Sequence, residues 1–236
     1  MAADGAFIAA LQSAFAAQAN PAQAAPMQAY MKSTLPFLGI AAPQRRRLTA
    51  EVAKAQPLQS ESALPDTMRA LWRAARFREL RYAASELAGL RPHAALRSLA
   101  LLPVFEEMIV SGAWWDHCDE ISGNGISALL QRWPEQIKPV LRRWANGENM
   151  WLRRASFLCQ RRLKDGFDAV LFYETILPSI GGSSLAGEFF IRKGLGWALR
   201  ERAYAAPDEV RAFCAEYRDR LSALTLREAL RVIDKR

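Results

Sequence analysis

Apolar side chains recur at helical spacing along the whole of this chain. Phe7, Leu11 and Phe15 fall on one helix face, and the segments 101–109, 126–130 and 210–217 repeat the same period. No segment has the convincing alternation of apolar and polar residues that marks a half-buried strand. The pattern therefore predicts an all-α fold of about a dozen helices, each of roughly 10 to 18 residues and joined by short loops.

Proline and glycine support this prediction. Proline fits the first turn of a helix, because the amide hydrogen it lacks has no partner there. Four prolines open predicted helices: Pro43, Pro65, Pro134 and Pro207. Four glycines stand where predicted segments end or turn: Gly89, Gly112, Gly147 and Gly166. The spacing Thr225-x-x-Glu228 predicts a capping box before the last helix.

A series of short antiparallel helices is typical of helical-repeat proteins, in which each pair packs on its neighbours and the array curves into a concave surface. The internal repeat in this sequence is weak, so a compact orthogonal bundle remains an alternative. The loop Gly181-Gly182-Ser183-Ser184 does not mark a second domain. We expect one all-helical domain over residues 1–236, curved into a solenoid.

The charge of the chain favours a polyanionic partner or an anionic surface. Lysine and arginine number 32 against 24 acidic residues, which gives a net charge of +8. The hydrophobic content of 51% excludes a disordered chain. No run of eighteen apolar residues occurs, so we predict no transmembrane span. The alanine-rich N-terminal segment lacks a basic region and contains Asp4, which favours an amphipathic helix over a targeting peptide.

The three cysteines, Cys118, Cys159 and Cys214, are far apart in apolar segments. This distribution predicts buried, reduced thiols in a cytoplasmic protein. Neither a disulfide framework nor a zinc pattern is visible, and we expect no metal and no cofactor.

Basic residues are concentrated between Leu141 and Lys164, a segment that contains seven of them and a single acid, Glu148. Two antiparallel helices joined at Asn146 to Asn149 could present these cations along one rim, which would suit phosphate contacts. A second basic cluster, Arg45-Arg46-Arg47, follows Pro43. For any one of these arginines, a solvated surface position remains the simpler interpretation.

The segment Trp114-Trp115-Asp116-His117-Cys118-Asp119 carries the strongest functional signal. Trp115 and Asp119 are four residues apart and therefore project from one helix face. An indole beside a carboxylate is a poor core element, because an unpaired buried charge is costly, but the two groups together attract a cation.

Two further segments place tryptophan beside charge or glycine. Trp151-x-x-Arg154 lies in the basic segment, and Gly194-Leu195-Gly196-Trp197 lies in a predicted helix. Glycine costs about 1 kcal/mol in a helix interior, so both glycines are expected to allow close approach of a neighbouring helix or a ligand. A tryptophan is usually a core residue, but seven in one chain, several beside charge, are less readily all core.

These segments together resemble the DNA alkylation repair glycosylases of the AlkD type. The resemblance rests on Trp114-Trp115-Asp116-x-x-Asp119, on the segments 149–155 and 188–201, on Leu224-Thr225-x-Arg227-Glu228-Ala229-Leu230, and on the early segments 30–32 and 37–46. It covers roughly residues 25 to 235, with these segments in the family's order.

The resemblance implies HEAT-like repeats whose basic concave face holds duplex DNA, and a monofunctional glycosylase that removes purines alkylated at N3 or N7. It implies that Asp119 is the catalytic carboxylate, with Trp115 and Trp197 as its aromatic pair. Arg154 then matches a backbone-binding arginine, and Tyr30 an aromatic near the DNA. Further DNA contacts are expected from three basic residues: Arg153, Arg45 and Lys193. The expected partner is duplex DNA with alkylated bases, bound by a monomer that is cytoplasmic and associated with the nucleoid.

The chemistry of the residues agrees with that role. An N3- or N7-alkylated purine is already cationic and leaves readily, so a carboxylate need only stabilise an oxocarbenium-like sugar and position water. Helical spacing turns His117 about 200° from Asp119, so we expect excision without a side-chain acid. Two alternatives remain: a non-catalytic HEAT-repeat protein that binds damaged or branched DNA, and a protein-interaction scaffold.

Overall fold

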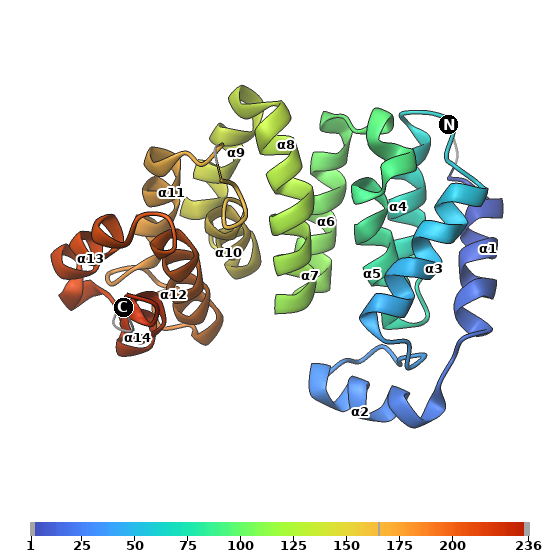
Figure 1. Ribbon diagram of the computed structural model, residues 1–236, viewed down its shortest axis with the longest axis horizontal. Helices are drawn as coiled ribbons and strands as arrows, with labels where there is room; N and C mark the ends of the chain where they lie inside the picture. The colour runs from blue at the N-terminus through green and yellow to red at the C-terminus, as the bar shows by residue number, and fades with distance from the viewer. Residues whose placement is uncertain (1–2, 165, 234–236) are drawn as a thin grey trace. The chain divides into compact units, whose positions relative to one another are not determined.

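The computed structural model describes residues 3–164 and 166–233 and confirms the all-α prediction (Figure 1). These residues form fourteen α-helices and no strand. The helices are α1 (Gly5–Ala16), α2 (Pro21–Met31), α3 (Ala42–Ala55), α4 (Ala63–Arg73), α5 (Arg78–Glu86), α6 (Leu102–Gly112), α7 (Trp115–Glu120), α8 (Ser127–Arg132), α9 (Pro134–Asn146), α10 (Met150–Leu158), α11 (Ala169–Ile176), α12 (Phe189–Ala203), α13 (Pro207–Glu216) and α14 (Ala223–Leu230). Several are shorter than the expected range, because 3₁₀ turns and one π-helical segment, Ile121–Ile126, interrupt the chain.

The helix boundaries largely follow the predicted punctuation. α9 and α13 begin at Pro134 and Pro207, and Gly147 follows the last residue of α9. The predicted capping box is wrong. Ser222 caps α14 by accepting a hydrogen bond from the backbone N–H of Thr225 at 3.0 Å. Thr225 therefore lies inside the helix, and its hydroxyl donates to the Arg192 carbonyl of α12 at 3.0 Å.

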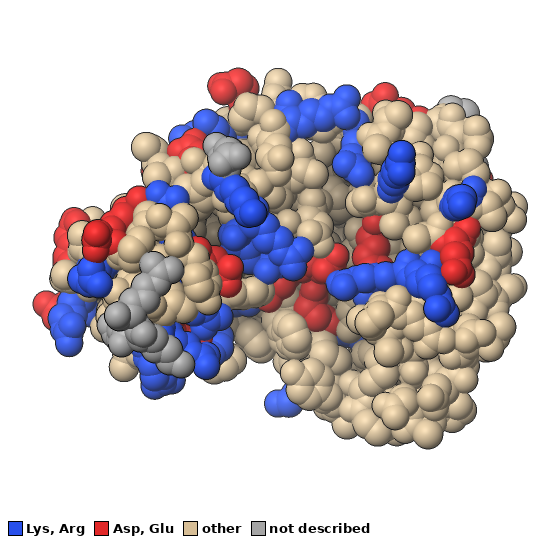
Figure 2. All heavy atoms as spheres, viewed as in Figure 1, with Lys and Arg blue, Asp and Glu red and all other residues tan. Residues whose placement is uncertain are grey.

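The chain divides into two compact units, Met1–Met108 and Ile109–Arg236, with the boundary inside α6. The single domain expected over 1–236 stays a prediction, and its ends, 1–2 and 234–236, lie outside the described residues. Within each unit, helices pack side by side as in a helical-repeat protein, among them α4 and α5 in the first unit and α9 and α10 in the second (Figure 1). On the face shown in Figure 2, basic side chains lie among acidic and uncharged ones. The basic concave surface also stays a prediction.

In the first unit, α1 packs on α3 and α4, and α4 packs on α5. Phe7, Leu11 and Phe15 are fully buried, so the face predicted from their spacing is the face that α1 buries. No helix in the described part of the chain is both long enough and apolar enough to cross a membrane.

A buried carboxylate anchors the loop before α3. Glu79, which is fully buried, accepts hydrogen bonds from the backbone N–H groups of Leu38, Gly39 and Ile40 at 2.9–3.2 Å. Gly39 has φ of 85°, and a side chain there would collide with the Asn20 carbonyl. The segment 38–40 is therefore fixed by its glycine and by one acid from α5.

In the second unit, α10 packs on α9 and α12, and α12 packs on α13 and α14. Its buried core includes Phe157, Phe172, Leu195 and Leu199. A Cβ on Gly196 would lie 2.6 Å from the Glu228 Cβ atom of α14. This confirms the expectation that glycine in this helix permits a neighbouring helix to approach closely.

Candidate functional site

The acid of the tryptophan-rich segment lies near the end of a very short helix. α7 contains six residues and runs directly into the π-helical segment Ile121–Ile126. Trp115 and Asp119 are one turn apart in it, and Asp119 is 8% exposed. The Ser122 hydroxyl donates to the Asp119 carbonyl at 3.3 Å. Isolated π-helical turns are frequent at functional sites, because they shift the register of the side chains around them.

Arg154 of α10 holds the Asp119 carboxylate in a two-pronged contact. Its Nε donates to Oδ1 at 2.8 Å and its Nη2 to Oδ2 at 2.9 Å. The remaining terminal nitrogen, Nη1, donates to the Phe190 carbonyl of α12. Arg154 is 4% exposed and Asp119 is 8% exposed, so water has little access to this pair of hydrogen bonds. The carboxylate consequently has a single fixed orientation.

Local sequence features make this contact possible. Asn149 caps α10 by accepting hydrogen bonds from the backbone N–H groups of Trp151 and Leu152, both at 3.0 Å. A side chain on Gly194 of α12 would collide with the guanidinium of Arg154. Gly194 therefore provides the space that the expected close approach requires, and the group that fills this space is an arginine from α10.

Electrostatics reinforces the pair. Burial by itself would lower the pKa of Arg154, but the hydrogen bonds and the charge of Asp119 outweigh it and raise that pKa. The neighbouring thiol of Cys118 is fully buried, and burial raises its pKa well above the usual value. All three cysteines are free and buried, as predicted. Cys118 is therefore a neutral packing group beside the ion pair.

Arg161 connects Asp119 to Trp197. Its Nη2 donates to the Asp119 carbonyl at 3.1 Å, and its guanidinium carbon lies 4.3 Å from the centre of the Trp197 ring. A Cβ on Gly123, in the π-helical segment, would lie 2.6 Å from that same Nη2. The sequence analysis included Arg161 only as one cation of the basic segment. A glycine in a helical segment was the available signal, but it did not indicate which arginine needed the space.

Trp197 and Trp115, the two predicted catalytic aromatics, are both half-buried. The Trp197 indole Nε1 donates to Glu201 Oε1 at 2.9 Å. Trp151 is buried instead, and its ring centre lies 6.3 Å from that of Trp114 and 5.1 Å from that of Phe190. Trp151 is thus part of a packed aromatic cluster.

The basic segment does not form one rim, and that expectation is wrong. Arg142, Arg143 and Arg162 are exposed, whereas Arg153 and Arg154 are buried. Arg153 donates to the Gly147 carbonyl at 2.6 Å, and also to the Pro178 carbonyl and the Ser183 hydroxyl. These contacts favour a structural role for Arg153, whose predicted DNA contact remains untested.

The other predicted DNA contacts differ in accessibility. Tyr30 is 77% exposed on α2, whereas Arg45 is buried beside Glu86, at 2.5 Å. Lys193 of α12 is partly exposed and pairs with Glu228 of α14 at 2.6 Å. Tyr30 and Arg45 belong to the first unit, and Lys193 belongs to the second together with Asp119, Trp115, Trp197 and Arg154. DNA contact by Tyr30, Arg45 and Lys193 stays a prediction.

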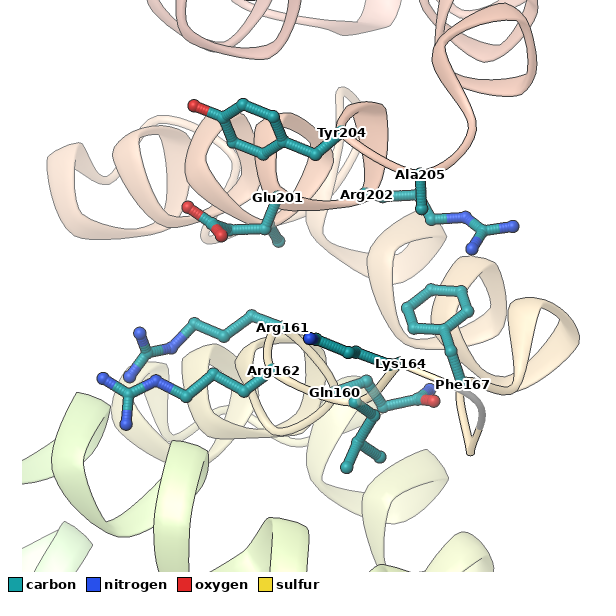
Figure 3. A pocket seen from close by; sticks show the side chains of 11 residues that line it. Gln160, Arg161, Arg162, Lys164, Phe167, Glu201, Arg202, Tyr204 and Ala205 are labelled. Atoms are coloured by element: carbon teal, nitrogen blue, oxygen red, sulfur yellow. The ribbon is translucent and has the colours of Figure 1, made fainter.

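A pocket of about 720 Å³ borders this cluster in the second unit (Figure 3). It lies between the turn after α10 and the C-terminal end of α12, and Arg161 and Glu201 both line it. The other lining residues are Gln160, Arg162, Leu163, Lys164, Phe167, Ala198, Arg202, Tyr204 and Ala205. Within the described residues, no group of three or more His, Cys, Asp or Glu side chains is placed to hold a metal ion.

Comparison with known proteins gives a consistent result. Residues 11–233 match the family described as "DNA alkylation repair enzyme". The chain is also similar to a solved structure described as a predicted DNA alkylation repair enzyme from Enterococcus faecalis, with 28% identity and a TM-score of 0.80. The similarity covers 92% of this chain and 98% of that one. The curated proteins gave no match. The chain therefore belongs to the DNA alkylation repair enzyme family.

Proposed function

We propose that this DNA repair protein is a monofunctional DNA glycosylase, which hydrolyses the N-glycosidic bond of purines alkylated at N3 or N7 in duplex DNA. One observation carries the proposal: the Asp119 carboxylate is fixed by Arg154, and its backbone carbonyl is tied through Arg161 to the ring of Trp197. An acid and an aromatic ring are thereby held in one cluster, as stabilisation of a developing cation requires.

The proposed reaction uses the charge that the lesion already carries. An N3- or N7-alkylated purine leaves as a neutral base, so positive charge moves to the sugar as the glycosidic bond breaks. Asp119 would stabilise that charge and position the attacking water. The fork from Arg154 occupies one direction at each carboxylate oxygen, and each oxygen keeps further lone-pair sites for water or for the sugar.

The aromatic residues have different places in this scheme. The guanidinium of Arg161 covers one face of Trp197, so the sugar would meet its other face or its edge. Trp115, one turn before Asp119 on α7, would supply the second ring. His117 is fully buried, in accord with departure of the base without protonation by this residue.

A second candidate is a non-catalytic protein that binds damaged or branched DNA. The observation that favours it is the near-complete burial of the Asp119–Arg154 pair, because a buried, doubly hydrogen-bonded carboxylate is also a common structural element. That function would retain DNA binding and lack base release.

The deciding experiment is the incubation of the purified protein with duplex DNA methylated at purine N3 and N7, followed by chromatography of the released bases. Release of N3-methyladenine and N7-methylguanine in proportion to the protein, with strands that stay intact until treated with alkali, supports a monofunctional glycosylase. DNA binding without release of any base supports the second candidate. If the protein neither binds the DNA nor releases a base, both candidate functions are contradicted.

A further inference from the structure

The pocket after α10 carries charge that the scheme above does not use. Arg161 and Arg162 extend side by side in Figure 3, Glu201 lies across from them, and Lys164 lies between them and Phe167. Two of the charged lining groups, Arg202 and Glu201, are engaged with side chains outside the pocket. Arg202 pairs with Glu209 at 2.6 Å, and Glu201 accepts the indole hydrogen of Trp197.

Arg162 and Lys164 remain available to a ligand. Both are exposed, and neither has an acidic partner among the described ion pairs. Arg162 donates a hydrogen bond from Nη1 to the uncharged amide oxygen of Asn124, at 3.0 Å. Its guanidinium can therefore offer further donors to an anion without first losing a salt bridge.

The walls of the pocket contain aromatic surface as well as charge. Tyr204 is 56% exposed, and Phe167 lies under the guanidinium of Arg202, at 4.3 Å from its carbon to the ring centre. A pocket of about 720 Å³ is larger than a lone phosphate needs and lies within the usual range for organic ligands. Cations together with exposed aromatic surface suit a phosphate that carries a sugar.

We propose that this pocket binds a backbone phosphate of the DNA strand through Arg162 and Lys164, with the attached sugar against Tyr204. DNA as the partner rests on the proposed function. Arg161 belongs to both places, because it lines the pocket and contacts the Asp119 carbonyl and Trp197. A phosphate held here therefore fixes the strand at a set distance from Asp119, and the contact positions the DNA without reading its sequence.

The first test measures binding to an undamaged duplex at several salt concentrations, so its result does not depend on base excision. The variants Arg162→Ala and Lys164→Ala are compared with Arg218→Ala, which removes an exposed cation outside the pocket. Each pocket variant is expected to bind roughly tenfold more weakly and to lower the salt slope by about one. Arg218→Ala is expected to change neither. Equal effects from all three variants would overturn the proposal, because the loss would then follow net charge alone.

The second test identifies the phosphate. A series of duplexes is made, each with one neutral methylphosphonate in place of a backbone phosphate. At one strand position the substitution should weaken wild-type binding and have little further effect on Arg162→Ala, whereas at other positions the two losses should multiply. Independent losses at every position would show that Arg162 contacts no single phosphate and would contradict the proposal.

A third variant tests the cavity without a change in charge. Ala205, at the pocket wall, is exposed and follows the end of α12, so Ala205→Leu fills space with no loss of core packing. Ala205→Leu should weaken binding to the duplex as Arg162→Ala does, while the unfolding temperature of the protein stays constant. Unchanged binding by Ala205→Leu would exclude the pocket as the site. If these tests succeed and no base is released from methylated DNA, the phosphate site stands and the glycosylase proposal fails.

Discussion

The two units of this protein each bury an arginine–carboxylate pair beside a stacked aromatic ring, and the two pairs differ in what surrounds them. In the first unit, Arg45 of α3 meets Glu86 of α5 at 2.5 Å and lies over the ring of Tyr82 at 4.4 Å. In the second, Arg154 meets Asp119, and a separate arginine, Arg161, covers Trp197.

The geometry of the pairs separates them. Arg45 and Glu86 meet end-on, and within the described residues the Arg45 Nε and the Glu86 Oε2 have no hydrogen-bond partner. In the second pair, both carboxylate oxygens of Asp119 accept hydrogen bonds from Arg154. Gly123 leaves room for the guanidinium of Arg161, and Gly194 for that of Arg154. A π-helical segment follows Asp119. A buried ion pair with an aromatic neighbour therefore does not by itself identify a site. The glycines and the adjoining pocket distinguish the second pair.

The largest expected effect is one that the two pairs share. Arg154→Ala leaves the buried Asp119 carboxylate without its ion-pair partner, and Arg45→Ala leaves Glu86 with the exposed Arg46 at 3.3 Å. Each loss is expected to cost up to about 3 to 5 kcal/mol of stability. Denaturant unfolding measures the loss. If both arginines are structural, neither variant changes the salt slope of DNA binding at a temperature where it is still folded. A slope lowered by about one for Arg154→Ala would instead support the phosphate contact that the family resemblance implies.

Removal of the negative charge should separate the pairs by activity. Asp119→Asn is expected to lower base release by about 10² to 10³ while DNA affinity stays nearly constant, because the charge acts only as the sugar becomes cationic. The matched variant Glu86→Gln should release bases at the wild-type rate per folded molecule. Single-turnover excision with saturating protein measures both. Equal rates for Asp119→Asn and wild type would remove Asp119 from the mechanism.

The half-buried tryptophans offer a smaller effect. Trp197→Ala and Trp115→Ala should each slow excision, because loss of a cation–π contact raises the activation free energy by about 0.5 to 2 kcal/mol. Their stability should fall by much less than the roughly 3 to 5 kcal/mol expected for the buried Trp72. Excision rates and unfolding curves are compared for all three. A Trp197→Ala variant as destabilised as Trp72→Ala, with normal excision when folded, would assign Trp197 to the core.

The smallest expected effect concerns the link between acid and ring. Arg161→Lys keeps the positive charge but loses the planar stack on Trp197, so excision should fall severalfold, with the change mainly in the rate of bond cleavage. Arg45→Lys removes the equivalent stack on Tyr82 and should leave excision unchanged. If Arg161→Lys altered only DNA affinity, Arg161 would belong to the phosphate pocket and not to the alignment of Asp119.

Much of the fold could be predicted from the sequence because its determinants are local. The spacing of Phe7, Leu11 and Phe15 defines the buried face of α1, and proline or glycine marks some helix ends, as at α9 and α13. The spacing of Trp115 and Asp119 indicated one helix face, and Gly196 indicated a close helix contact. Such features depend on backbone geometry within a few residues, which the sequence specifies directly.

Only the tertiary structure decided which cations are buried. Arg143, Arg153 and Arg154 belong to one basic segment. Arg143 is exposed, Arg153 donates hydrogen bonds to backbone carbonyls, and Arg154 pairs with a carboxylate 35 residues away. An arginine is buried only where other helices bring enough acceptors to offset its desolvation, and no local pattern records those partners. For the same reason, the helical period could place Asp119 on one helix face with Trp115, whereas the contacts of Arg161 with Asp119 and Trp197 could be found only in the tertiary structure.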